Sequence, residues 1–212
     1  MSSEIGNTKK WFLAIAGNIG AGKSTLVARM AGRLGWQPFY EPVTENPYLL
    51  DFYQDMRAWA FHSQVFFLTR RLRAHRQLIS HPTSAIQDRC VYEDAEIFAR
   101  NLHRQGMIDN RDYRAYSELY EILCEFLPPP DLIVYLQAST TTLQERIRLR
   151  GRDYERQISR AYIEQLNHLY DDWAESFHLC PLLTVATDHL DFVGNEDHLD
   201  WIIREVFVRL MP

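Results

Sequence analysis

Apolar and polar positions along this chain follow two alternating patterns. Short, nearly continuous apolar runs cover residues 11–16, 37–40, 84–87, 132–136 and 182–185. Longer stretches repeat their apolar positions every three or four residues, as helices with one buried face do; the main ones are 57–79, 112–126 and 161–178. Strands that alternate with helices predict an α/β fold in which helices flank a five-stranded parallel sheet.

The predicted helices are longer and more numerous than the crossovers of such a sheet require, so some of them should pack on one another. The last one, over 196–210, has a single apolar face formed by residues three and four apart: Leu199, Ile202, Ile203, Val206 and Leu210. No internal repeat, low-complexity tract or long Gly/Ser-rich linker divides the sequence. We therefore expect residues 1–212 to form a single domain.

The bulk composition argues against several classes of protein. A net charge of -5 disfavours a nucleic-acid or anionic-membrane partner. No apolar run approaches the length of a membrane span, and the first residues resemble neither a signal nor a transit peptide, so the expected location is the cytoplasm. Cys90, Cys124 and Cys180 are scattered and lack metal-ligand spacing, which predicts reduced thiols.

A glycine-rich segment follows the first predicted strand directly and precedes a helical stretch. It reads Gly17-Asn18-Ile19-Gly20-Ala21-Gly22-Lys23-Ser24-Thr25, the full P-loop pattern in its strand–loop–helix setting. In such a loop backbone N–H groups converge on phosphate oxygens, Lys23 reaches the outer phosphates and Ser24 offers a hydroxyl to Mg²⁺. A plain glycine-rich turn and a nucleotide-controlled switch are the alternatives. A GTPase switch would carry an Asn-Lys-x-Asp segment, and this sequence has none.

A kinase also needs an acceptor site beside the phosphate donor, with a base near the attacking hydroxyl. Open parallel sheets bind ligands at the carboxyl ends of their strands. Glu41 ends the second apolar run, and Asp88 and Arg89 end the third. Each carboxylate is equally compatible with a helix cap or a solvated strand end, but their shared placement favours function.

Four further segments follow the P-loop in order: Glu41-Pro42-Val43, then Trp-Ala-Phe-His-Ser-Gln at 59–64, Asp-Arg-Cys-Val-Tyr-Glu-Asp at 88–94 and Leu-Arg-Gly-Arg at 149–152. In this order and spacing the chain resembles the deoxynucleoside kinases, the family of deoxycytidine, deoxyguanosine and deoxyadenosine kinases. The resemblance runs from the P-loop to about residue 191. The chain departs from it at Asp88, where many members have Glu, at Cys90, where Ser is common, and at Tyr154, a position that is often acidic.

The resemblance implies a role in phosphoryl transfer for five residues. Glu41 would be the general base for a 5′-hydroxyl, while Arg89 steadies that base and the developing charge, and Lys23 stabilises the phosphates. Asp88 would hold Mg²⁺ together with Ser24. ATP would be the phosphate donor.

An arginine-rich segment is predicted to close over the donor phosphates as a short lid. Arg146 and Arg150 are four residues apart on one helix and share a face, and Arg152 follows Gly151. A solvated charged helix paired with Glu145 is the alternative. By resemblance, Asp191 and Phe192 would lie against the adenine of ATP.

The resemblance also assigns residues to the acceptor. Tyr53 and Glu155 would bind the sugar 3′-hydroxyl, and the base would be bound by Gln64, Arg71 and Asp94. Gln64 and Arg71 are seven residues apart, two helical turns, so independently of the family both can point into one pocket. Trp59 and Phe66 have the same spacing and can contact the base or pack in the core.

The base preference follows from the predicted pair of Arg71 and Asp94. Arginine can only donate and an ionised aspartate can only accept, which suits adenine and cytosine, whereas guanine presents two acceptors. Because residues 88–94 resemble those of bacterial deoxyadenosine kinases, we rank deoxyadenosine first, deoxycytidine and deoxyguanosine next and thymidine last.

Two other functions remain as alternatives. A nucleoside monophosphate kinase such as thymidylate kinase shares the P-loop but needs a cationic site for the acceptor's phosphate, and a non-catalytic nucleotide-binding switch would not turn over ATP with a nucleoside. The surplus helices, and the dimers usual in the resembled family, predict a homodimer.

Overall fold

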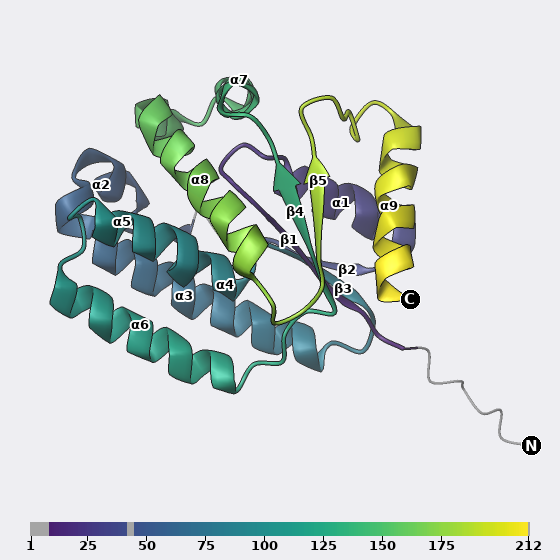
Figure 1. Cartoon of the computed structure of the whole chain (residues 1–212), viewed down its shortest axis with the longest axis horizontal. Coiled ribbons are helices and arrows are strands. Elements are labelled where there is room, and N and C mark those ends of the chain that lie inside the picture. Colours follow the sequence, from purple (N-terminus) through teal and green to yellow (C-terminus); the bar gives the residue numbers. More distant parts are fainter. Residues whose placement is uncertain (1–8, 42–44, 212) are drawn as a thin grey trace, which may run out of the picture.

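A sheet of five parallel strands organises the computed structural model, which describes residues 9–41 and 45–211 (Figure 1). Its strands run in the spatial order β2-β3-β1-β4-β5. They are β1 (Phe12–Gly17), β2 (Gln37–Phe39), β3 (Ala85–Asp88), β4 (Leu132–Gln137) and β5 (Leu182–Ala186). The predicted α/β fold is confirmed, and both ends of every strand lie within one residue of the predicted apolar run.

The register of the strands brings their carboxyl ends to one edge of the sheet. In the central strand β1, Ile15 lies opposite Asp88 of β3 and Val134 of β4, and Gly17 lies opposite Leu136. Since all five strands are parallel, the segments that leave β1, β2 and β3 start side by side at this edge. The P-loop, Glu41 and Asp88-Arg89 belong to these segments.

One face of the sheet is covered by α1 (Lys23–Leu34) and α9 (Glu196–Leu210), which contact each other (Figure 1). Leu13 and Ile15 of β1 belong to the apolar cluster on this face. The apolar residues of α9 that the sequence places on one stripe, from Leu199 to Leu210, pack into the same cluster. The predicted closing helix is confirmed with its buried face.

The other face carries the surplus helices. Ala14 and Ala16 of β1 pack toward α3 (Met56–Ser80) and α8 (Arg160–Ser176), and between them runs a helical stretch made of α4 (Val91–Glu93), a π-helical segment (Asp94–Ala99) and α5 (Arg100–Arg104). The remaining helices of this layer are α2 (Leu49–Gln54), against α3, and α6 (Asn110–Glu125), on the outer side of α3 and α5 (Figure 1). The prediction that some helices pack on one another is therefore confirmed.

The segment that carries the predicted lid lies between β4 and α8. It consists of α7 (Thr140–Arg150) and a 3₁₀ turn (Asp153–Gln157). Two serines set its boundaries, because the hydroxyl of Ser139 accepts the N–H of Thr142 at 3.2 Å and that of Ser159 accepts the N–H of Tyr162 at 3.1 Å. None of the helices in the described part of the chain is long and apolar enough to cross a membrane.

Candidate functional site

The P-loop connects β1 to α1 and leaves the start of α1 open to a ligand. Gly20 and Gly22 have φ angles of 86° and 97°, which favour glycine, and a Cβ on Gly20 would lie 2.8 Å from the carbonyl oxygen of Leu143. Gly22 precedes α1, and no side chain caps the first turn of that helix. The N–H groups of this turn and the positive end of the helix dipole can therefore bind phosphate oxygens.

Lys23 lies buried at the centre of this loop. Its Nζ donates to the carbonyl oxygens of Gly17 at 2.8 Å and Asn18 at 2.9 Å. Burial, followed by the nearby Arg89 guanidinium, lowers the pKa of Lys23 to about 8, although Asp88, Glu41 and Glu93 partly oppose that shift. The ammonium is held among loop atoms where it can reach the outer phosphates of a nucleotide.

Ser24 and Asp88 have the donor set of a magnesium site. The hydroxyl of Ser24 donates to Oδ2 of Asp88, while the buried Oδ1 of Asp88 has no hydrogen-bond partner among the described residues. Burial raises the pKa of Asp88. No cluster of three or more Asp, Glu, His or Cys ligands occurs among residues 9–41 and 45–211, but Mg²⁺ is commonly held by one or two protein oxygens together with substrate phosphates. These two residues therefore fit the ion.

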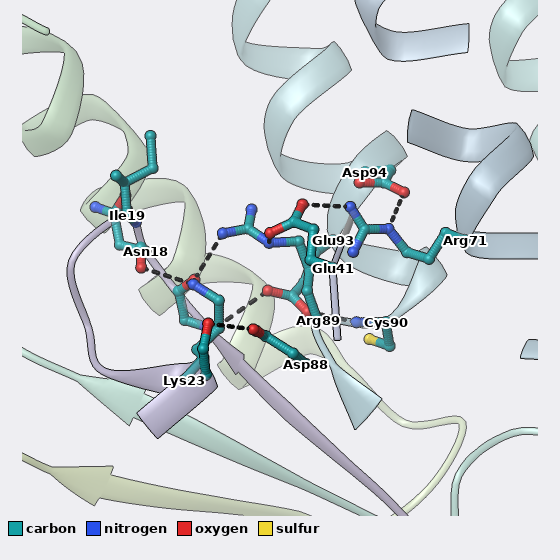
Figure 2. A network of polar contacts seen from close by, with 12 residues as sticks. Asn18, Ile19, Lys23, Glu41, Arg71, Asp88, Arg89, Cys90, Glu93 and Asp94 are labelled. Atoms are coloured by element: carbon teal, nitrogen blue, oxygen red, sulfur yellow. Dashed lines mark hydrogen bonds and ion pairs between the residues drawn. The ribbon is translucent and has the colours of Figure 1, made fainter. Parts of the chain in front are cut away.

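Glu41 is held by two arginines. Arg71 Nη2 donates to Glu41 Oε1 at 2.9 Å, and Arg89 Nε lies 3.3 Å from Glu41 Oε2 (Figure 2). Burial alone would raise the pKa of Glu41, but Arg89, Arg71 and Lys23 together lower it to about 2. Glu41 is consequently a carboxylate at neutral pH, aimed by two fixed cations.

Arg71 also pairs with Asp94, so it lies between two carboxylates (Figure 2). Nε of Arg71 donates to Oδ2 of Asp94, which is 2% exposed. Burial raises the pKa of Asp94 to about 6 against the opposing effect of Arg71, so this carboxyl is mainly ionised above neutral pH. The pair predicted from the sequence is present in the structure.

A cavity of about 410 Å³ joins these groups. Its lining includes most of the residues that the sequence indicated: Ile19, Gly20, Gly22, Lys23, Ser24, Thr25, Glu41, Tyr53, Gln64, Arg71, Asp88, Arg89, Asp94, Arg150, Arg152 and Glu155. The P-loop and Asp88 supply the phosphate end. Gln64, Arg71 and Asp94 supply the opposite end, and Glu41 and Arg89 lie between the two.

The three lid arginines have different surroundings. Arg150 forms two contacts with Glu155, at 3.0 Å from Nε and 2.6 Å from Nη2, and Arg152 Nη1 lies 3.4 Å from the same carboxylate. Arg146 instead donates to the carbonyl oxygens of Thr187 at 2.7 Å and Ala21 at 3.3 Å, and it lies outside the cavity lining. Closure of this segment over a bound nucleotide stays a prediction.

Besides Arg146, five predicted nucleotide-binding residues lie outside the cavity lining: Gly17, Asn18, Ala21, Asp191 and Phe192. Asn18 ties the P-loop to α8, because its Nδ2 donates to the carbonyl oxygen of Ile163 at 2.9 Å and to Oδ1 of Asn167 at 2.7 Å. The carboxylate of Asp191 accepts the N–H groups of Val193 and Gly194, while Phe192 is buried behind Gly22. A contact of Asp191 or Phe192 with adenine stays a prediction.

The sequence predicted Tyr53 in the cavity wall but not the other aromatic residues there. Phe67, Phe98, Tyr154 and Tyr162 line the cavity, together with Leu49 and Phe52. The guanidinium carbon of Arg89 lies over the ring of Phe98, 4.3 Å from the ring centre. Tyr154 stacks on Tyr53, with 6.1 Å between the two ring centres.

One of these aromatic residues, Phe67, could have been predicted from the helical face that carries Gln64 and Arg71. Phe67 lies three residues after the first and four before the second, so it shares their face. Of the two aromatics that the sequence raised, Trp59 stacks on Tyr48 and Phe66 contacts Arg70, and neither lines the cavity.

Comparison with known proteins decides which family carries this arrangement. A family model described as deoxynucleoside kinase matches residues 13–211. The chain belongs to the deoxynucleoside kinase family. It is therefore a phosphotransferase, which the resemblance had implied, and kinases of this family use ATP.

Relatives of this deoxynucleoside kinase match over most of its length. A deoxyadenosine/deoxycytidine kinase from Bacillus subtilis (strain 168) is 34% identical over 200 residues, which cover 93% of this chain and 92% of the relative. A deoxyadenosine kinase from Dictyostelium discoideum is 38% identical over 179 residues, covering 82% and 73%. The solved structure of a deoxyadenosine kinase from M. mycoides with bound dATP superposes with a TM-score of 0.83 at 32% identity, over 93% of this chain and 99% of that one.

The relatives do not agree on the acceptor. A deoxyguanosine kinase from Bacillus subtilis (strain 168) is 33% identical over 199 residues, or 92% of this chain and 95% of that relative, nearly the identity of the deoxyadenosine/deoxycytidine kinase. Similarity alone therefore leaves the preferred base open.

The lowered pKa of Lys23 predicts how the enzyme captures ATP as the pH rises. We expect kcat/KM for ATP to fall above pH 8, by about tenfold per pH unit at the alkaline end, since the free enzyme's Lys23 loses its proton near pH 8. Steady-state rates at limiting ATP between pH 7 and 9.5 measure this.

The matched control is kcat/KM for the nucleoside at saturating ATP, where bound phosphate keeps Lys23 protonated and the value should stay nearly flat. An unchanging kcat/KM for ATP across the range would contradict the prediction.

Proposed function

We propose that this kinase transfers the γ-phosphate of ATP to the 5′-hydroxyl of a deoxynucleoside, with deoxyadenosine preferred. One observation carries the proposal: a single cavity joins the P-loop, the arginine-held carboxylate of Glu41 and the Arg71–Asp94 pair. The three cysteines are free thiols, in keeping with a reducing compartment, and we expect the protein in the cytoplasm.

Glu41 acts as the general base in this proposal. It is ionised at neutral pH, because its pKa is about 2, and its two arginine contacts fix its direction. It accepts the hydrogen bond of the 5′-hydroxyl and takes the proton as the bond from that oxygen to the γ-phosphorus forms and the bond from the γ-phosphorus to the leaving oxygen breaks. The products are ADP and the deoxynucleoside 5′-monophosphate.

Fixed cations stabilise the charge that develops on the transferred group. Lys23 and Arg89 both donate to the carbonyl oxygen of Gly17, so the two cations lie close together. Mg²⁺, held by Asp88 and Ser24, would neutralise charge on the donor phosphates. Because these groups are held in a buried site, little reorganisation is needed as the charge moves.

The acceptor end favours a nucleoside over a nucleoside monophosphate. Tyr53 and Glu155 line this part of the cavity and offer hydrogen bonds to a sugar hydroxyl. An acceptor phosphate would need a cation there, but Arg71 and Arg89 are already paired with carboxylates and Arg150 with Glu155. This supports a deoxynucleoside kinase over the thymidylate kinase alternative.

Arg71 and Asp94 favour adenine among the bases. Arg71 donates to a ring nitrogen, while ionised Asp94 accepts from an exocyclic amine, a pattern that adenine N7 and N6 and cytosine N3 and N4 can meet. Guanine offers N7 and O6, which leaves Asp94 facing an acceptor. Oε1 of Gln64, buried without a partner among the described residues, can accept a further hydrogen bond from the base.

We expect deoxyadenosine to have the highest kcat/KM in a screen of the four deoxynucleosides and their monophosphates, deoxycytidine and deoxyguanosine to follow, and thymidine to be last. The gap to thymidine should exceed about tenfold, because each unpaired buried polar group costs roughly 1 to 3 kcal/mol. The assay is run at pH 8, where Asp94 is ionised.

Asp94→Asn gives the matched control for this screen. An asparagine amide can donate to guanine O6, so the variant should lower the ratio of deoxyadenosine to deoxyguanosine efficiency. A wild-type enzyme that uses thymidine as well as deoxyadenosine would refute the proposed base contacts, and activity on monophosphates alone would refute the acceptor.

Replacement of Glu41 tests the chemical step. Glu41→Gln should lower kcat by about a hundredfold or more and leave ATP affinity nearly unchanged, since the amide cannot take the proton and the P-loop is not altered. Lys23→Ala is the contrasting variant, because it should weaken phosphate stabilisation on the donor side. A Glu41→Gln enzyme with near wild-type kcat would remove Glu41 as the base.

The homodimer predicted from the sequence has a candidate surface on α6. Leu119 and Ile122 of this helix are 44% and 55% exposed, and Phe126 just beyond it is 77% exposed. They follow one another at intervals of three and four residues and form one apolar stripe on the outer side of the helix layer. We propose that a second copy of the chain covers this stripe.

Sedimentation at micromolar concentration should therefore give about twice the mass of one 25.0 kDa chain. Ile122→Glu should shift the mass toward one chain, while Glu121→Gln, exposed on the same helix but not three or four residues from any member of the stripe, should not. A wild-type mass of one chain would contradict the dimer.

A further inference from the structure

Backbone pairing between β1 and β3 stops just before the P-loop. On the β3 side, the carbonyl of Trp11 accepts the N–H of Ala85 at 2.8 Å and the carbonyl of Ile15 accepts the N–H of Arg89 at 2.9 Å. Gly17 is the next residue of β1 that faces this side. At Arg89 the chain turns away with a φ of 65°, so β3 offers no partner to the N–H of Gly17.

The carboxylate of Glu93 takes the place of that missing strand partner. Its Oε1 accepts the N–H of Gly17 at 3.2 Å and the hydroxyl of Tyr170 at 2.7 Å. Its Oε2 accepts the N–H of Cys90 at 2.9 Å (Figure 2). Glu93 is 0% exposed, and it does not line the cavity.

These contacts link the two loops that supply cations to the reaction. Gly17 opens the P-loop, and its carbonyl accepts from Lys23 Nζ at 2.8 Å and Arg89 Nη2 at 3.4 Å. Cys90 directly follows Arg89, whose left-handed backbone is costly for a residue with a side chain and persists only where its surroundings fix it. One carboxylate therefore anchors the peptide that opens the P-loop and the peptide that follows Arg89.

We propose that Glu93 is a positioning residue for phosphoryl transfer, which holds Gly17 and Cys90 in register so that Lys23 and Arg89 converge on the transferred phosphoryl group. This inference rests on the roles proposed above for Lys23 and Arg89. The rival is a purely structural role, in which Glu93 only satisfies buried N–H groups and contributes to stability.

Glu93→Gln separates the two roles. Three donors converge on the carboxylate, but an amide has one accepting oxygen and an NH₂ group that must face at least one of the backbone N–H groups. The link between the loops is thereby broken with little change in volume. We expect kcat to fall at least about tenfold, with KM for the nucleoside within about threefold, because Glu41, Arg71 and Asp94 are untouched.

The measurement is kcat per nucleotide-binding site, counted by ATP titration, with folding followed by circular dichroism. A lower melting temperature with kcat per site within threefold of wild type would overturn the proposal in favour of the structural role. If Glu93→Gln does not fold, Glu93→Asp decides: it keeps the charge but is one methylene shorter, so it should lose kcat to a similar extent.

Tyr170→Phe is the matched control, since it removes one of the three donors and keeps the ring and both backbone contacts. Its kcat should stay within about threefold of wild type. A loss as large as that of Glu93→Gln would show that the backbone link is not responsible, and would overturn the proposal.

A double-mutant cycle with Arg89→Lys distinguishes failure of this inference from failure of the proposed function. If Glu93 acts through Arg89, the combined loss of kcat is smaller than the product of the single losses; fully multiplicative losses would overturn that link. An Arg89→Lys enzyme with wild-type kcat would instead remove the proposed role of Arg89. All ratios use the best deoxynucleoside of the wild type, so a wrong base preference leaves them valid.

Discussion

The burial of opposite charges at the carboxyl ends of β1, β2 and β3 is the constraint on which this site depends. Lys23, Arg71 and Arg89 are at most 7% exposed and lie against Glu41, Asp88 and Asp94. Removing an ion from water costs roughly several kcal/mol even after relaxation, so each charge must be paired and hydrogen-bonded to be tolerated. The parallel register brings three strand ends to one place, and α3 and the π-helical segment add Arg71 and Asp94 to them.

Pairing of this kind adds little to the stability of the fold, since well-packed apolar residues often stabilise a protein as much as a buried ion pair does. It does preorganise the charged side chains of the site, because a guanidinium that already binds two carboxylates cannot rotate freely. Arg71 illustrates this, because its Nη2 donates to Glu41 and its Nε donates to Asp94. One cation therefore orients both the proposed general base, Glu41, and the residue proposed to recognise the nucleobase, Asp94. The network therefore fixes the distance between the two ends of the cavity.

How far the sequence predicts the molecule depends on the range of the interactions involved. The five strands and the long helices follow from local periodicity, and the P-loop follows from its spacing, so these were predicted to within a residue or two, whereas the short helices between residues 49 and 54 and between 91 and 104 were not predicted. The pairing of Arg71 with Asp94 was predicted through the family resemblance. The contact of Glu93 with Gly17 joins residues 76 positions apart across a strand end, and no local pattern marks it. Phe98 and Tyr154 were missed as cavity residues for a different reason, since nothing near them in the sequence separates an aromatic side chain of the cavity wall from one of the core.

The surroundings of the site residues indicate which contacts contribute most to the free energy of ligand binding. Several groups that meet substrates in the proposed mechanism have protein partners in the structure: Lys23 contacts loop carbonyls, Ser24 contacts Asp88, and Arg150 contacts Glu155. For these groups binding exchanges one polar contact for another, so the net gain per contact is modest. Oδ1 of Asp88 and Oε1 of Gln64 are different, because both are buried without a partner among the described residues. An ion at the first atom and a donor at the second would relieve a cost that the folded chain already carries, which places the largest gains at the metal and at the nucleobase.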